Sequence, residues 1–193
     1  MKVFLLDNGH GKETAGKRSP VWPDGSQLFE WSFNRDMVAR IKARAVKAGL
    51  LVVDLVPELE DVSLAERVAR ANRWHDVTNA RAVLISIHAN AGGGTGFEVY
   101  TSRGRTKADN YASVIYNALK TAFPEQKMRS DMSDGDEDKE ADFYILRNTR
   151  CPAILCENLF MDNYTDCRLL LQEDFRDKLA DAYVGALKQL NVL

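Results

Sequence analysis

Two of the three histidines in this 193-residue chain follow strand-like apolar runs. His10 lies in the segment DNGHG (7–11), and His88 ends the run AVLISIH (82–88). Ligand sites of open α/β sheets gather beyond the carboxyl ends of the strands, so both histidines are expected to face one crevice. Small neighbours such as Gly9 would let a metal ion and a substrate approach the backbone. A lone histidine is more often structural, which is the interpretation for His75 in the middle of a predicted helix.

Two glutamates are candidates for a third metal ligand and for a general base. Glu30 opens a predicted helix after the first loop, and Glu157 ends the run PAILCE (152–157). Two His and one Glu form a known zinc set that leaves the fourth position for water, whose proton a free carboxylate can take. The residue types leave open which glutamate binds. The structural alternatives are a charge at a helix N-terminus for Glu30 and an ion-paired strand end for Glu157.

The run GKETAGK (11–17) offers a different chemistry, because it is close to a phosphate-binding loop. Arg18 stands where that motif needs a hydroxyl for the metal ion. Pro20 and Pro23 interrupt the segment that should form the following helix. The histidine interpretation is therefore favoured over nucleotide binding.

Strand-like runs alternate mostly with helical patterns, which predicts an α/β fold. We expect a single domain over residues 1–193, with a mostly parallel six-stranded sheet flanked by helices. Strands are expected at residues 2–6, 50–56, 82–88, 96–101, 142–146 and 152–157. Helices are expected near residues 30–48, 63–76, 106–122 and 175–190. The polar segment 125–140 is expected to be a solvated loop.

Composition excludes several classes of protein. The hydrophobic content of 45% and charged content of 28% are those of a globular chain, and the net charge of −2 provides no basic field for nucleic acid. No apolar run is long enough for a membrane span or a signal peptide, so we expect cytoplasmic synthesis, with delivery by another agent if the chain acts elsewhere, or a signal already removed. The three cysteines lack metal-binding spacing and are expected to be buried or partly buried free thiols, which suits folding in a reducing compartment.

Seven features in the same order resemble the zinc-dependent N-acetylmuramoyl-L-alanine amidases of the amidase-3 type. The collinear match spans nearly the whole chain. The features are DNGHG (7–11), Glu30 before a helix, SLAERVARAN (63–72), ISIHANA (85–91), GFEVYT (96–101), YILR (144–147) and PAILCENLFMDN (152–163).

The resemblance implies a mixed sheet with one zinc ion at its edge, bound by His10, Glu30 and His88. It implies hydrolysis of the amide that joins the lactyl group of N-acetylmuramic acid to L-alanine in peptidoglycan. Glu157 would take a proton from the attacking water and pass it to the leaving amine. Peptidoglycan or a muropeptide is then the partner, and a monomer that acts on the bacterial cell wall is expected. The alternatives are a zinc hydrolase acting on another amide and an inactive wall-binding domain.

Four further residues are candidates for supporting roles. Asp7 and Asn90 are expected to orient the ligands or to contact substrate. The loop 14–25 lies between two ligands, and its Lys17 and Arg18 could meet a carboxylate of the peptide stem. A solvated basic loop is an equally good interpretation of this pair.

The chain also departs from the family pattern. Asn8 stands where the family usually has proline, and Lys12 stands where it has a third glycine. Neither is a ligand in the resemblance, so the metal site should persist. Some relatives carry an inhibitory helix before the strand with the catalytic glutamate. Residues 125–141 are acidic, contain glycine and do not resemble a helix, so an open site is predicted.

Overall fold

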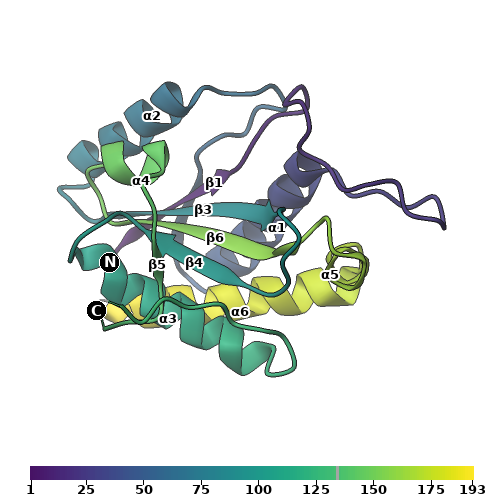
Figure 1. Cartoon of the computed structure of the whole chain (residues 1–193). Coiled ribbons are helices and arrows are strands. Elements are labelled where there is room, and N and C mark those ends of the chain that lie inside the picture. Colours follow the sequence, from purple (N-terminus) through teal and green to yellow (C-terminus); the bar gives the residue numbers. More distant parts are fainter. Residues whose placement is uncertain (134) are drawn as a thin grey trace.

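The sheet has the strand order β2-β1-β3-β6-β4-β5 in the computed structural model, which describes residues 1–133 and 135–193 (Figure 1). All neighbouring strands are parallel except β4 and β6, which are antiparallel. This confirms the predicted α/β class with a mostly parallel, mixed sheet. The strands are β1 (Val3–Asn8), β2 (Leu51–Asp54), β3 (Ala82–Asn90), β4 (Glu98–Thr101), β5 (Lys139–Glu140) and β6 (Ala153–Phe160).

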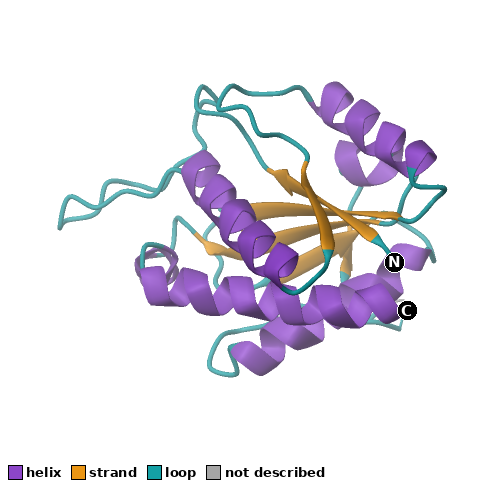
Figure 2. Cartoon of the chain, turned by 180° about the vertical axis from the view of Figure 1, so that it is seen from behind, coloured by secondary structure: helices purple, strands orange, loops and turns teal. Residues whose placement is uncertain are grey.

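Helices cover both faces of the sheet, as Figures 1 and 2 show. The helices are α1 (Glu30–Lys47), α2 (Leu64–Val77), α3 (Lys107–Ala122), α4 (Tyr144–Asn148), α5 (Tyr164–Leu170) and α6 (Glu173–Val192). Side chains alternate along β1, so Phe4 and Leu6 pack into the core beneath α1, α3 and α6. Val3 and Leu5 pack into a smaller core beneath α2 and α4. This alternation later decides which face carries the functional side chains.

The helices begin where polar side chains can satisfy free backbone N–H groups. The Ser63 hydroxyl accepts a hydrogen bond from the Glu66 N–H at 3.3 Å and caps α2 as predicted. Thr106 and Asp109 form a capping box at the start of α3. The expected helices near residues 30–48, 63–76, 106–122 and 175–190 are all present.

The prediction of a strand at residues 142–146 is wrong. These residues lead into the short helix α4, in which the adjacent Ile145 and Leu146 are both buried against the α2 side of the sheet. A strand would point adjacent side chains to opposite faces, but both are apolar and one core is available to them. Short apolar runs do not by themselves distinguish the two structures. Helix α5 was also not predicted from the sequence.

The sixth strand comes instead from the polar segment expected to be a loop. In β5, Lys139 pairs with Tyr100 of β4, and the Lys139 ammonium contacts the buried Glu98 carboxylate at 2.7 Å. The strand forms because a distant acidic partner lies beside it, which no local pattern indicates. The rest of the described segment 125–133 and 135–138 contains no helix, as expected for an open site.

Residues 12–29 form a narrow arm that extends away from the sheet between β1 and α1 (Figures 1 and 2). The base of the arm is closed by a β-bridge between Arg18 and Phe29. The Glu30 N–H also donates to the Lys17 carbonyl at 3.1 Å. No helix follows GKETAGK before Glu30, so the aligned donors of a phosphate-binding loop are missing there.

Two expectations from composition can be compared with the structure. Within residues 1–133 and 135–193, no helix combines the length and the apolar character that crossing a membrane requires. Cys151, Cys156 and Cys167 are free and buried, as predicted.

Candidate active site

The side chains of His10, Glu30 and His88 meet at the carboxyl end of the sheet. The Glu30 Oε1 atom lies 3.3 Å from His10 Nε2 and 3.0 Å from His88 Nδ1. One possible ligand atom from each residue lies within 4.8 Å of the other two. The imidazole rings are nearly perpendicular, with centroids 5.0 Å apart. The structure therefore brings together the three residues predicted as ligands.

His10 reaches this position through an unusual backbone conformation. Its φ angle is 65°, in the left-handed region that residues other than glycine rarely adopt. Its carbonyl accepts hydrogen bonds from Arg35 at 2.8 Å and from Arg67 at 3.3 Å. We interpret these two arginines as the groups that hold the strained loop and direct the ring toward Glu30.

Gly9 is required because the ring of His88 lies against its backbone. A Cβ atom at this position would lie 2.0 Å from His88 Cε1. The Gly9 carbonyl is also held by the Asn34 side chain of α1, which donates at 3.0 Å. The small residue beside His10 was expected to let a metal ion and a substrate approach the backbone, and in the structure the second imidazole takes up this space.

Strand register places Glu157 beside His88. The two residues are direct partners in the parallel pair β3–β6, and both side chains point to the face covered by α2 and α4. The Glu157 Oε2 atom is buried and has no hydrogen-bond partner. The fold therefore leaves one oxygen of this carboxylate without a partner among the described residues.

A buried chain of hydrogen bonds supports His88 from behind. The Ser86 hydroxyl donates to Asp7 Oδ2 at 2.5 Å, and His88 Nε2 lies 3.1 Å from Ser86 Oγ. Asp7 also forms a buried ion pair with Arg67 at 2.6 Å. Because the single hydroxyl proton of Ser86 goes to Asp7, Nε2 of His88 must be the protonated nitrogen that donates to Ser86. The Nδ1 atom faces Glu30 at 3.0 Å, where it donates to the carboxylate when protonated and offers a lone pair when it is not.

The charges of the site shift the pKa values of its acids and bases. Burial favours neutral Glu30, but hydrogen bonds to His10 and His88 outweigh it and hold the pKa of Glu30 well below its usual range. Burial favours neutral His88, yet the hydrogen bond to Glu30 and the charges of Glu157, Glu30 and Asp7 raise the pKa of His88. Burial and the charges of Glu30 and Glu98 raise the pKa of Glu157 to about 7, against the opposing effect of His88 and Lys17.

A cavity of about 410 Å³ opens onto these residues. Its floor includes His10, His88 and Glu157, and its walls come from the arm, the start of α2 and the start of α4. The apolar wall contains Phe143 and Tyr144, whose exposed fractions are 39% and 40%. The cavity is wide enough for a small substrate segment to reach the candidate ligands.

The four supporting candidates lie in different places. Asp7 is buried beneath the site, where it holds Arg67 and Ser86. Lys17 lines the cavity, whereas Arg18 lines an adjacent groove of the arm. Asn90 donates to Glu98 at 2.5 Å and does not line the cavity.

Sequence reasoning missed several residues that shape the site. Ser86 is the one hydroxyl in an apolar strand, two residues before His88 and therefore on the same face, which is a signal that could have found it. Arg67 occupies a buried position on α2, where a charged side chain needs a partner. Arg35 gives no such signal, because its role depends on the path of the loop around His10.

Two imidazoles, a carboxylate in contact with both and a second carboxylate left free form the donor set of a metal-dependent hydrolase. The comparisons with known proteins agree with this class. The Amidase_3 family, described as N-acetylmuramoyl-L-alanine amidase, matches residues 4–189. The chain belongs to this family of enzymes, which confirms the resemblance predicted from the sequence.

Individual relatives are named as N-acetylmuramoyl-L-alanine amidases or as an endolysin. The chain is 30% identical to the sporulation-specific N-acetylmuramoyl-L-alanine amidase of Bacillus subtilis, with 98% of this chain and 68% of the relative covered. It is 31% identical to the endolysin of Bacillus phage SPP1, with 98% and 66% covered. The chain thus spans about two thirds of the length of these relatives. The N-acetylmuramoyl-L-alanine amidase AmiC2 of Nostoc punctiforme superposes with a TM-score of 0.80 at 26% identity, over 98% of this chain and 97% of that one.

Proposed function

We propose that the chain hydrolyses the amide between the lactyl group of N-acetylmuramic acid and L-alanine in peptidoglycan, with one zinc ion bound by His10, Glu30 and His88. The observation that carries the proposal is the convergence of these three side chains beside Glu157, whose Oε2 atom is buried and unpartnered. The family matched by residues 4–189 supports the choice of bond.

The donor set fits a zinc ion. Two imidazole nitrogens and one carboxylate oxygen are ligands that zinc prefers at catalytic sites. His88 Nδ1 lies 3.0 Å from a Glu30 oxygen, and a bare lone pair would repel the carboxylate at this distance, so a positive charge is required between or beside the two atoms. A proton on the imidazole or a metal ion would supply it. The third ligand, His10 Nε2, converges on the same oxygen and favours the metal.

When bound, zinc would polarise the lactyl carbonyl and acidify the attacking water. Glu157 is placed to act as the general base, since its free oxygen lies beside His88 on the same sheet face. A pKa near 7 leaves a substantial fraction of Glu157 ionised at neutral pH, while keeping the carboxylate a stronger base than an ordinary glutamate.

The proton balance follows from this placement. Glu157 accepts one proton from water as the water oxygen bonds to the lactyl carbonyl carbon. Glu157 then donates that proton to the amide nitrogen as the carbon–nitrogen bond breaks. The second proton of the water stays on the new lactyl carboxyl group and then passes to the amine or to solvent, so the products at neutral pH are a lactyl carboxylate on the sugar and an ammonium group on alanine. Asp7 and Ser86 keep His88 oriented throughout, because both lie in the buried chain behind its ring.

Digestion of purified peptidoglycan tests the function directly. Mass analysis should detect stem peptides with a free alanine amine, and a chelator should abolish their release until zinc is restored. Cleavage of a sugar–sugar or peptide–peptide bond instead would reject the proposed bond. Full activity after complete removal of metal would reject the proposed cofactor.

The proposed partner is peptidoglycan itself, with the chain acting as a monomer on the bacterial cell wall. The printed names of the relatives include both an endolysin and a sporulation-specific amidase, so they favour wall hydrolysis without selecting one physiological setting.

A further inference from the structure

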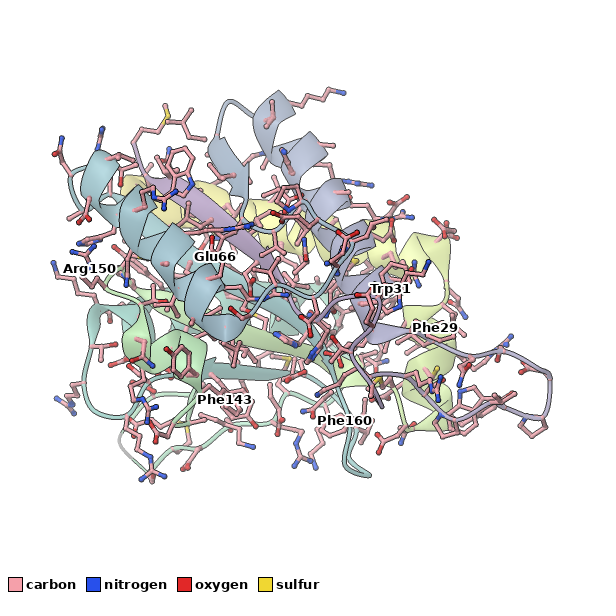
Figure 3. All side chains as sticks on the ribbon, turned by 90° about the horizontal axis from the view of Figure 1, so that it is seen from above. Phe29, Trp31, Glu66, Phe143, Arg150 and Phe160 are labelled. Carbon is pink, nitrogen blue, oxygen red and sulfur yellow. The ribbon has the colours of Figure 1, made fainter. Side chains whose placement is uncertain are left out.

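The active-site cavity has two dissimilar walls on opposite sides of the candidate ligands. Figure 3 shows Phe143 on one side of the strand ends and Phe29 and Trp31, at the base of the arm, on the other. Lys17 belongs to the second side, because its carbonyl accepts the N–H of Glu30 and its neighbour Arg18 is bridged to Phe29. A substrate that lies across the candidate metal ligands would therefore contact a different kind of surface at each end.

The surface formed by the arm is basic, and its cationic side chains have no polar partner in the described part of the chain. Lys12, Lys17 and Arg18 make no side-chain hydrogen bond or ion pair with any residue in the described ranges 1–133 and 135–193. These cations line a groove of about 260 Å³ with Phe29 and Trp31, and Glu13 is the one acidic residue on its walls. Lys17 lines both this groove and the central cavity, so this residue borders both spaces.

Lys17 is also the free cation of the central cavity. Among the described lining residues, the other permanently charged base is Arg67, and it is buried in an ion pair with Asp7. Lys17 thus borders the cavity that contains the reaction centre, and its backbone carbonyl is held by the N–H of Glu30.

The opposite wall is apolar and partly exposed. Phe143 stacks edge-on against Tyr100 at 5.2 Å, which fixes its ring at the cavity. The Tyr144 hydroxyl donates to no residue in the described part of the chain. Leu64, at the start of α2, is 52% exposed on the same cavity. This wall offers apolar contact area and a free hydroxyl but no charge for an anion.

We infer that substrate binds in one orientation, with the carboxylate-bearing stem peptide over the arm, where Lys17 meets the carboxylate nearest the scissile amide, and the saccharide against Phe143 and Tyr144. This inference rests on the proposed function and adds a specificity determinant to it. The reverse orientation would leave the stem carboxylates against an apolar wall and the three basic residues of the arm without a partner.

The test uses two muropeptides that differ in one carboxylate. N-acetylmuramoyl-L-alanyl-D-glutamate and its α-amide are titrated calorimetrically into the zinc-loaded Glu157→Gln protein, in which slow turnover leaves the ligand intact during the titration. The acid should bind about two- to fivefold more tightly than the amide, as expected for one solvent-accessible charge pair, and the preference should shrink as salt is added. Lys17→Met should abolish the preference, and Lys17→Glu should reverse it.

Lys47→Met is the matched control, because Lys47 is an exposed lysine at the far end of α1. It should leave the preference unchanged. Equal binding of acid and amide to the parent protein would overturn the inference, and so would a preference that survives in Lys17→Met.

The saccharide wall is tested with the same stem carried on a lactyl group alone. Tyr144→Ala should weaken binding of the muramoyl peptide several-fold and leave binding of the lactyl peptide unchanged. Equal losses for both ligands would reject this wall as the saccharide site. Selective binding without any hydrolysis by the wild-type enzyme would refute the proposed function alone, whereas hydrolysis without charge selectivity would refute the orientation alone.

Discussion

Removal of the Ser86 hydroxyl is expected to weaken the metal site without touching a ligand. In Ser86→Ala, the Nε2–H group of His88 loses its acceptor at 3.1 Å, and Asp7 Oδ2 loses its donor at 2.5 Å. Ser86 is fully buried, so solvent does not replace these bonds. An unsatisfied buried polar group costs about 1–3 kcal/mol, and loss of the group that orients a ligating histidine lowers metal affinity roughly 10–100-fold.

Two measurements separate the effects on folding and on metal binding. Denaturant unfolding of the zinc-free protein should show the loss of about 1–3 kcal/mol. Competition with a chromogenic chelator should show the weaker zinc affinity at a temperature where both proteins are folded. Ser113→Ala is the matched control, because Ser113 on α3 donates to Glu137 at 3.1 Å at a partly buried position. It should change both quantities little.

The affinity measurement decides the role of Ser86. Zinc affinity equal to that of the wild type would show that the buried chain does not orient His88, even if stability falls. A drop in stability alone would leave Ser86 as a packing residue. Ser86 would then not be the acceptor that fixes the proton on Nε2 of His88.

Glu157→Gln should retain zinc but reduce kcat by a factor on the order of 10²–10⁴, as loss of a general base predicts; near-normal turnover in a steady-state assay would reject that role. Gly9→Ala should lower zinc affinity and stability, because its Cβ would lie 2.0 Å from His88, whereas Gly185→Ala in α6 meets nothing within 4 Å and should stabilise the protein by about 0.5–1 kcal/mol in thermal unfolding. The pKa of Glu157 is about 7 in the folded protein against an ordinary 4.5, so the folded state favours the protonated carboxyl group. The stability that this group contributes to the fold is fully present below about pH 4.5 and is lost as the pH rises through about 7. Between about pH 5 and pH 8, zinc-free wild type should therefore lose on the order of 3 kcal/mol of stability relative to Glu157→Gln, and parallel pH profiles would contradict the shift.

The two histidine ligands could be predicted from the sequence, because their positions depend on where predicted strands end. His10 and His88 each follow an apolar run, and parallel strands bring their carboxyl ends to one edge of a sheet. The order of motifs then allowed the resemblance to assign Glu30 and Glu157. Their roles as ligand and base stay predictions. In the structure His10, His88 and Glu157 line one cavity, and Glu30 contacts both histidines.

The wrong prediction at residues 142–146 has a physical cause that no local pattern contains. Ile145 and Leu146 choose a helix because a single core receives both side chains. The polar residues Lys139 and Glu140 form a strand because β4 offers a free edge and Glu98 offers a charge. In both places tertiary contacts override weak local preference.

The sequence by itself determined the alternation of strands and helices, the residue types able to bind a metal ion and the family to which the chain belongs. These properties depend on periodicity and motif order along the chain, which folding does not alter. Only the tertiary structure decided that Ser86, Asp7 and Arg67 form a buried support for His88, and that Lys17 and Phe143 line the same cavity. Those relations join residues far apart in sequence, and their distances follow from strand register and from the path of the arm.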